Sequence, residues 1–411
     1  MSSAVATPIE LGFPPDQLGE LVERFFPGLR CPIRKNLRLL VSAFVTLTST
    51  LRSCNGELSL ASVARALPLP TSFRDRYKRL NRLLDNPRFD PQGVSEGLFG
   101  LVWGQKTRGF IPIIVDQSSL GQAQLLMAGT PFAGRTLPLG LMTFTYEDIQ
   151  TRPDREKSQN FVERLFFLQL LETAPEGCSC CFILDRGYAR VSLMQELLAQ
   201  AGVLFVLRTK RNVVIEREKR GRRTKCAIGS LKARAGCPRR LTRIRYRATK
   251  PIEVDLLIYY EPGHKEPWYL LLPPGSSDIL PDHEVVAMYR RRMRIEHGFR
   301  DFKTHLGLSG LQLQVRVSER TQRLLLAFTL AYSLVVALGT TRLAEEVRER
   351  LECSRRTARH GTSRILSARS VAALMLCGLC AEILSRLAKT LDRLARRALA
   401  GEGLYHCAPR L

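Results

Sequence analysis

Acidic residues are scarce in this chain of 411 residues. Asp and Glu number 38 against 63 Lys and Arg, which gives a formal net charge of +25 at pH 7 and a pI near 10.2. An excess of this size favours a polyanionic partner, with nucleic acid ahead of a membrane surface. The alternative is that the charge serves solubility alone. Charge does not distinguish DNA from RNA.

Segments that target or anchor a protein are not evident. The first 20 residues contain no basic stretch followed by an apolar one, so we expect no secretory signal and a cytoplasmic location. The apolar run from Leu324 to Leu338 has 15 residues and contains Thr329 and Ser333, whereas a membrane span needs about 20. We therefore expect a buried helix here and no membrane partner.

Motifs for nucleotide chemistry are also missing. The chain has no loop with the spaced glycines of a phosphate-binding motif, no G-x-G-x-x-G after a strand, and no H-E-x-x-H. These absences argue against ATP or nicotinamide as a cofactor.

Helical patterns occur at both ends of the chain. Residues 35–53 have helical periodicity, and Leu58 to Leu84 predicts two helices around the turn PLPTS. Ser72 and Asp75 form a capping pattern before the second helix, which carries the basic residues Arg74, Arg76, Lys78, Arg79 and Arg82. This helix either enters a DNA groove or presents an ordinary solvated basic face. After the apolar run, the C-terminal stretches are again helical in pattern.

Strand patterns begin after Gly100. GFIPIIVDQSSL predicts a buried strand that ends at Asp116, and LPLGLMTFTYED predicts its hairpin neighbour. A helix is expected over residues 157–173. The segment CCFILDRGYARVSLMQELLAQAGVLFVLRTK then predicts strand, helix and strand, with Asp185 at the end of the first strand. Because parallel strands of such a unit end at one edge of the sheet, we expect Asp116 and Asp185 to meet.

A strongly basic stretch follows. Arg208 to Lys225 contains nine basic residues among eighteen, and the runs VDLLIYY and PWYLLLPP behind it are typical of strands. The pattern indicates a basic β-rich segment, and the alternative is a mobile charged loop without specific contacts.

The segment DHEVVAMYRRRMRIEHGFRDFKTHLGL predicts one long helix with Asp282 as its N-cap. At about 100° per residue, four polar side chains project from one narrow face of such a helix, namely Tyr289, Arg292, Glu296 and Lys303. An adjacent apolar stripe consists of Met288, Ile295, Phe299, Phe302 and Leu306.

Three carboxylates stand out in these patterns. Asp116, Asp185 and Glu296 offer the hard oxygen atoms that hold Mg²⁺ or Mn²⁺. Three carboxylates suffice for a two-metal site for phosphodiester displacement, and the flanking cations would hold a phosphate. Each carboxylate also has an ordinary alternative: a turn cap for Asp116, an ion pair with Arg186 for Asp185, and a charged helix face for Glu296.

The spacing Y-x2-R-x3-E-x6-K from Tyr289 to Lys303 resembles the signature of bacterial insertion-sequence DDE transposases of the insertion-sequence-four family. Asp116 after an apolar strand and Asp185 within LDRGY resemble the first and second aspartates of that family. The resemblance covers roughly residues 30–335. In one departure, Gln117 to Ser119 follow the first aspartate where many relatives have Thr.

The resemblance implies an α/β fold with an RNase H-like catalytic core interrupted by a β-rich insertion. The expected parts are a helical N-terminal DNA-binding region over 1–100, the first part of the core over 101–207 and the basic insertion over 208–275. The second part of the core, with the helix of the catalytic glutamate, is expected over 276–315 and a helical C-terminal region over 316–411.

The resemblance also implies roles for single residues. Asp116, Asp185 and Glu296 would be catalytic and bind two Mg²⁺ or Mn²⁺ ions. Tyr289, Arg292 and Lys303 would contact the terminal phosphates of the DNA, with Arg74, Arg76 and Lys78 as further DNA contacts. Trp268, 28 residues before Glu296, either stacks on a flipped base or packs in the core of the insertion.

The implied function is a transposase that binds the inverted terminal repeats of double-stranded DNA, hydrolyses the terminal phosphodiester and joins the freed 3′-hydroxyl to target DNA. Two DNA ends imply a homodimer in the active complex, in the cytoplasm of a bacterium and associated with its nucleoid. Two alternatives remain. One is a catalytically inactive DNA-binding remnant or repressor, and the other is a structure-specific, metal-dependent nuclease that cuts without joining.

Overall fold

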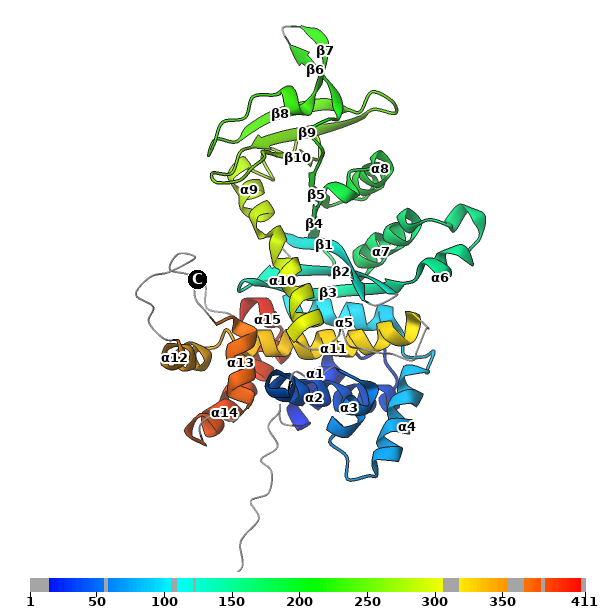
Figure 1. Cartoon of the computed structure of the whole chain (residues 1–411), viewed down its shortest axis with the longest axis vertical. Coiled ribbons are helices and arrows are strands. Elements are labelled where there is room, and N and C mark those ends of the chain that lie inside the picture. Colours follow the sequence, from blue (N-terminus) through cyan, green and yellow to red (C-terminus); the bar gives the residue numbers. More distant parts are fainter. Residues whose placement is uncertain are drawn as a thin grey trace, which may run out of the picture.

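The computed structural model describes residues 15–54, 58–104, 109–120, 123–219, 221–305, 318–352, 366–377 and 381–407. Its centre is a ten-stranded mixed sheet in the order β3-β2-β1-β4-β5-β10-β9-β8-β6-β7 (Figure 1). The strands are β1 (Phe110–Leu120), β2 (Ala123–Phe132), β3 (Arg135–Phe144), β4 (Ser179–Leu184), β5 (Val203–Arg208), β6 (Val214–Lys219), β7 (Arg222–Ala227), β8 (Arg239–Tyr246), β9 (Ile252–Tyr259) and β10 (Trp268–Leu272). The chain is a mixed α/β protein, as its patterns predict.

One half of the sheet contains the parallel strands. β1 pairs in parallel with β4, and β4 pairs in parallel with β5. The helix α8 (Val191–Ala199) joins β4 to β5, so the predicted strand, helix and strand are confirmed, as is the predicted helix over 157–173, which is α7 (Gln159–Thr173). Both parallel pairs are rich in buried apolar residues, as expected for strands covered on two faces.

Two strand predictions were wrong. β1 does not end at Asp116 but continues to Leu120, and its hairpin partner is β2, a strand that was not predicted; β3 pairs with β2 instead. The polar residues after Asp116 mark the point where β1 leaves its parallel neighbour β4 and remains paired with β2. They lie in a less deeply buried part of the strand and therefore do not need apolar side chains.

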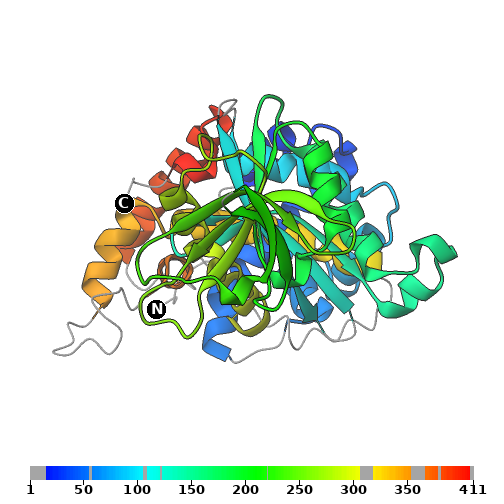
Figure 2. The same ribbon diagram turned by 90° about the horizontal axis from the view of Figure 1, so that it is seen from above.

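The other half of the sheet is antiparallel. β5 pairs with β10, and the ladder continues through β9 and β8 to the β6–β7 hairpin. The runs VDLLIYY and PWYLLLPP lie in β9 and β10 as predicted. Where it is described, the basic stretch from Arg208 to Lys225 forms the end of β5 and this hairpin instead of an unstructured loop. Figure 2 looks down on this end of the molecule and shows how the strands twist across the sheet.

Helices flank the sheet on both sides. In Figure 1, α7 and α8 lie on one side, and α9 (Asp282–Arg290) and α10 (Arg294–Arg300) lie on the other. The remaining helices are α1 (Pro15–Phe25), α2 (Cys31–Cys54), α3 (Leu60–Ala66), α4 (Phe73–Leu84), α5 (Pro91–Trp103), α6 (Tyr146–Gln150), α11 (Ser318–Leu338), α12 (Arg342–Leu351), α13 (Ala368–Leu376), α14 (Ala381–Leu399) and α15 (Gly403–His406).

The segment from Asp282 is helical to His305, as predicted over the described residues, but it is not one regular α-helix, and in that respect the prediction was wrong. A 3₁₀ turn at Arg291–Met293 separates α9 from α10, and a π turn at Asp301–His305 ends α10. α9 lies beside β10, whereas α10 packs across β1, β2 and β3. Because the sheet twists between these strands, a straight helix cannot follow both. In the apolar stripe, Met288, Ile295, Phe299 and Phe302 are buried as predicted, and Leu306 lies outside the described residues.

The helix start was also misplaced by one position. Pro281 occupies the N-cap and makes no side-chain capping bond, whereas Asp282 is the first residue of α9. Its carboxylate Oδ1 instead accepts a hydrogen bond from Arg240 Nε at 2.8 Å, which ties α9 to β8.

A layer of helices covers the β3 end of the sheet. α11 packs against β3 and also contacts α2, α5 and α13. It is the one described helix long and apolar enough to cross a membrane, but 94% of its apolar window is buried inside the structure. Thr329 Oγ1 and Ser333 Oγ donate to carbonyl oxygens of their own helix at 2.7 and 2.9 Å. The predicted buried helix is therefore confirmed, and its apolar character on all sides reflects burial.

N-terminal and C-terminal helices meet in this helical layer. α1 packs against α14, and α5 packs against α15, where the Trp103 and Tyr405 rings stack with centroids 4.2 Å apart. In the N-terminal part, Ser72 caps α4 as predicted, because its Oγ accepts the Asp75 backbone N–H at 3.2 Å. Segments more than 300 residues apart in sequence thus build one layer beneath the sheet.

Candidate active site

The pairing of β1 with β4 brings two aspartates to one edge of the sheet. The last aligned residues of this parallel pair are Ile114 and Ile183. Asp116 and Asp185 each lie two residues further along, so they occupy equivalent positions on neighbouring strands, as the pattern predicts. Asp116 stays in β1, where its Oδ1 accepts the backbone N–H of Gln117 at 2.9 Å. Asp185 follows β4 directly and begins a short 3₁₀ turn.

Arg292 joins these aspartates to Glu296. Its Nη1 lies 3.1 Å from Asp116 Oδ2, and its Nη2 lies 3.5 Å from Asp185 Oδ2 and 3.2 Å from Glu296 Oε1. The Arg292 side chain is only 10% exposed, whereas that of Glu296 is 43% exposed. Three carboxylates from β1, the end of β4 and α10 therefore converge on one guanidinium. The break between α9 and α10 places Arg292 in the 3₁₀ turn that faces this edge.

Burial and charge oppose each other at this cluster. Burial raises the pKa of Asp116 above 3.8, and the nearby Asp185 carboxylate acts in the same direction, while Arg292 and the Gln117 N–H act against the rise. Burial acts to lower the pKa of Arg292, but the attraction of Asp185 and Asp116 outweighs it and leaves this pKa above the ordinary value of an arginine. The guanidinium is therefore charged at all relevant pH values.

The chemistry of this set fits a hard divalent cation. All candidate ligands are carboxylate oxygens, and Asp185 Oδ1 is buried without a hydrogen-bond partner among the described residues. In the arrangement seen here, no group of three or more His, Cys, Asp or Glu side chains in the described ranges lies close enough to hold an ion. The Arg292 guanidinium lies between the three carboxylates and forms an ion pair with each of them.

Tyr289 and Trp268 form an aromatic cluster beside the carboxylates. Their ring centroids are 5.0 Å apart, and Trp268 also contacts Tyr259 and His264 with centroids 5.7 and 5.6 Å away. Trp268 is only 6% exposed. In this structure its ring is therefore packed among neighbouring side chains and is not available for stacking on a base. Burial raises the pKa of Tyr289 to about 12, with Arg292 acting in the opposite direction, so its hydroxyl stays neutral at physiological pH.

Lys303 is not joined to this cluster by an ion pair. It sits in the π turn after α10, and its ammonium forms no ion pair with any residue that the structure describes. Burial lowers the pKa of Lys303. Of the four residues expected on one narrow helix face, Arg292 and Glu296 form an ion pair and Tyr289 packs against Trp268, whereas Lys303 forms no ion pair with the other three.

The basic residues of α4 divide into two kinds. Arg74 and Lys78 are exposed on the helix surface. Arg76 Nη1 instead donates to the carbonyl oxygens of Arg65 and Leu67 at 2.9 and 3.4 Å, where α3 ends. Arg74 and Lys78 are therefore free to meet a ligand, whereas Arg76 joins α4 to α3.

A polar chain behind Asp116 was not predicted. Glu163 of α7 is 3% exposed, and its carboxylate accepts hydrogen bonds from Gln159 Nε2 at 2.7 Å and from Arg190. Gln159 Nε2 also lies 2.8 Å from Gln117 Oε1, next to Asp116. The only signal in the sequence is a lone carboxylate on an otherwise apolar helix face, with Val162 and Phe166 buried beside it.

Comparison with known protein families bears on this arrangement. Residues 157–334 match the family described as Transposase DDE domain. The match contains Asp185, Tyr289, Arg292, Glu296 and Lys303, and Asp116 lies before its start. It supports a transposase domain, that is, an enzyme of phosphoryl transfer with DNA as its substrate, and domains of this kind generally use divalent metal ions. No curated protein matches the chain.

Proposed function

We propose that this chain is a DDE transposase of the insertion-sequence-four family that binds inverted terminal repeats and catalyses metal-dependent cleavage and strand transfer of DNA ends. The observation that carries the proposal is the convergence of Asp116, Asp185 and Glu296 on Arg292. The Transposase DDE domain match across two of these carboxylates supports it independently.

In this proposal β1 to β5 form an RNase H-like core. The order β3-β2-β1-β4-β5, with β1, β4 and β5 parallel and β1 to β3 antiparallel, supports that assignment. β6 to β10 lie between β5 and α9 in the chain, which is where a β-rich insertion over 208–275 would interrupt the core. We retain 1–100 and 316–411 as helical terminal regions and 276–315 as the second part of the core.

Asp116, Asp185 and Glu296 would hold two Mg²⁺ or Mn²⁺ ions in the active protein. Such ions, when bound, activate an attacking hydroxyl and stabilise the leaving oxygen of an in-line phosphodiester displacement. Arg292 offsets part of the negative charge of the three carboxylates in the present arrangement and ties them together at one edge of the sheet. Its planar guanidinium also suits two-point binding of a DNA phosphate.

Further residues would bind the DNA. Lys303 offers an ammonium without an ion-pair partner in the described ranges, and Tyr289 offers a neutral hydroxyl close to Arg292. Trp268 would stack on a flipped base only after leaving its aromatic neighbours. Exposed Arg74 and Lys78 on α4 would contact the phosphate backbone away from the site, and Arg76 would assist them by fixing α4. Two DNA ends would be joined by a homodimer.

The deciding experiment incubates the protein with DNA that carries the inverted repeats of its element, with Mg²⁺, Mn²⁺ or EDTA, and resolves nicked, excised and joined products. Joined product that depends on metal supports a transposase. Cutting without joining favours the nuclease, and binding without cleavage favours the inactive remnant or repressor.

Replacement of Asp185 by Asn tests the site itself. We expect end cleavage to fall on the order of 10³-fold or more, because a carboxylate that holds the ions is lost, while binding of the ends stays close to that of the wild type. Asp154→Asn is the matched control, because the Asp154 side chain is 93% exposed and pairs with Lys157 instead of a residue of the site. Full activity of the Asp185→Asn protein would contradict the assignment.

A further inference from the structure

A fourth carboxylate lies one turn beyond Glu296 and is almost completely buried. Asp301 begins the π turn that ends α10, and it is 1% exposed. Charged side chains at this depth are rare unless they are paired, because burial removes their hydration. Asp301 is not part of the Y-x2-R-x3-E-x6-K pattern, and nothing in the proposed chemistry uses it.

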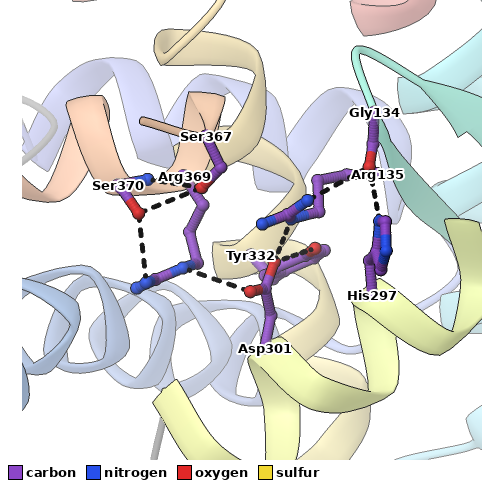
Figure 3. Close-up of polar contacts among 8 residues, drawn as sticks. All are labelled: Gly134, Arg135, His297, Asp301, Tyr332, Ser367, Arg369 and Ser370. Carbon is purple, nitrogen blue, oxygen red and sulfur yellow. Dashed lines mark hydrogen bonds and ion pairs between the residues drawn. The ribbon is translucent and has the colours of Figure 1, made fainter. Parts of the chain in front are cut away.

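Its partners come from three other elements. Arg135 Nε of β3 lies 2.6 Å from Asp301 Oδ2, and the Tyr332 hydroxyl of α11 donates to the same oxygen at 3.0 Å. Arg369 Nε of α13 lies 3.5 Å from Asp301 Oδ1. Figure 3 shows the two guanidinium groups reaching the carboxylate from different sides, with the Tyr332 ring beside them. Arg369 is only 2% exposed and the Arg135 side chain is 18% exposed, so one buried and one partly buried cation face a buried anion.

A second tie holds α10 one turn earlier. His297 Nδ1 lies 3.3 Å from the carbonyl oxygen of Gly134, and Arg135 Nη1 donates to that same oxygen at 3.1 Å (Figure 3). The turn before β3 therefore contacts α10 at residue 297, and the first residue of β3 contacts residue 301, where the π turn begins. Two contacts four residues apart on one helix face fix both the rotation of the helix and its position along its axis.

Glu296 takes its direction from this helix. It precedes His297 and points toward Arg292 and, through it, toward Asp116 and Asp185. A rotation of α10 by one residue position, about 100°, would turn Glu296 away from the two aspartates. The side chains that prevent this rotation lie about 100° and about 140° around the helix from Glu296 and contact β3, the turn before it, α11 and α13.

We propose that Asp301 is a positioning residue for Glu296, and that its cluster with Arg135, Tyr332 and Arg369 holds α10 in register with the two aspartates. This inference rests on the proposed function, because it assigns a role within the same site. It also gives the C-terminal helices a part in the chemistry, since α13 supplies Arg369. Asp301 touches no reacting atom.

The test uses the full chain and the variant Asp301→Asn, which keeps the shape of the side chain and removes its charge. We expect the concentration of Mn²⁺ at half-occupancy, measured by calorimetric titration without DNA, to rise about tenfold, in the range typical for residues that orient metal ligands. Single-turnover cleavage at limiting Mn²⁺ should slow by a similar factor and recover at saturating Mn²⁺. The Kd for end DNA should stay within about twofold of the wild type.

Two companion variants separate positioning from stability. Asp255→Asn is the matched control, because Asp255 of β9 is 0% exposed, is paired with Arg240 at 3.7 Å and belongs to the other half of the sheet. It should lower the melting temperature and leave Mn²⁺ affinity unchanged. Tyr332→Phe removes one hydrogen bond and keeps the charge of Asp301, so it should shift Mn²⁺ affinity in the same direction by a smaller factor, even if Asp301→Asn fails to fold.

The outcomes separate the two proposals. If the wild type binds Mn²⁺ and cuts DNA, but Tyr332→Phe and any folded Asp301→Asn protein match it in Mn²⁺ affinity and rate, the positioning role is wrong and the proposed function stands. If the wild type neither binds Mn²⁺ nor cuts end DNA, the proposed function fails and the inference fails with it.

Discussion

Arg292 offsets part of the negative charge of the candidate site. Arg292 forms ion pairs with three carboxylates, and because only 10% of its side chain is exposed, it has little contact with solvent. Removing one partner from a buried ionic cluster leaves the remaining charges uncompensated, which costs more than the cluster itself contributes to stability. In this arrangement the arginine reduces the repulsion among three acidic side chains that share one sheet edge.

Arg292→Gln should therefore destabilise the protein by about 1–2 kcal/mol in EDTA, a value below that of a fully buried pair because the carboxylates remain partly exposed. In Mn²⁺ the loss should be smaller, since bound ions would replace the missing charge and stabilise the folded state. Urea unfolding in both buffers measures the difference. Arg290→Gln is the control, because Arg290 is half-exposed and paired with Glu261. Equal losses for Arg292→Gln with and without Mn²⁺ would contradict this account.

At the scale of elements, the broken helix decides the shape of the site. α9 lies beside β10 and α10 lies across β1, β2 and β3, so the 3₁₀ turn between them spans the twist of the sheet. Short segments of 3₁₀ or π geometry inside helices often mark functional positions. Here such a segment directs Arg292 to the sheet edge, and the π turn behind α10 directs Asp301 into the helical layer.

The junction of α11 with α13 depends on one glycine. A Cβ added at Gly339 would lie 1.9 Å from the backbone oxygen of Ala368, and backbone cannot move aside as a side chain can. Gly339→Ala should therefore lower the free energy of unfolding by about 1–3 kcal/mol, as for other overpacked sites. Gly28→Ala is the matched control, since a Cβ there meets nothing within 4 Å. Urea unfolding checks both variants, and equal stability of the two would refute the close contact.

At the scale of the whole molecule, the terminal helices and the strongly basic hairpin lie at opposite ends of the sheet. The terminal helices pack together beneath β3, and the strongly basic hairpin of β6 and β7 lies at the other end of the sheet. The net charge of +25 is spread over both parts, so a DNA duplex can be attracted from either end.

Binding to end DNA should therefore depend steeply on salt. The logarithm of the association constant should fall linearly with the logarithm of salt concentration, because each neutralised phosphate releases bound counterions. The double variant Arg74→Gln and Lys78→Gln should reduce the magnitude of this slope by about 2. Lys389→Gln with Arg393→Gln removes the same charge from exposed positions of α14 and should leave the slope nearly unchanged. Affinity that does not respond to salt would contradict the electrostatic account.

Local patterns in the sequence were enough for most elements and for the site candidates. Apolar runs of strand length predicted β4, β5, β9 and β10, because burial requires them to be continuous. The rule that parallel strands end together predicted that Asp116 and Asp185 lie at one edge. β2 was missed, because its mixed sequence AQLLMAGTPF has neither clear alternation nor a continuous apolar run.

Other features depend on contacts between distant parts of the chain. Elements up to 176 residues away in sequence decide whether Arg292 faces DNA or the carboxylates. Distant elements also decide where the helix from Asp282 changes its geometry and which side chains surround Asp301. The pairing of the terminal helices belongs to this group as well. Short-range periodicity carries no information about such partners, because the twist of the sheet and the packing of side chains set them only when the whole fold has formed.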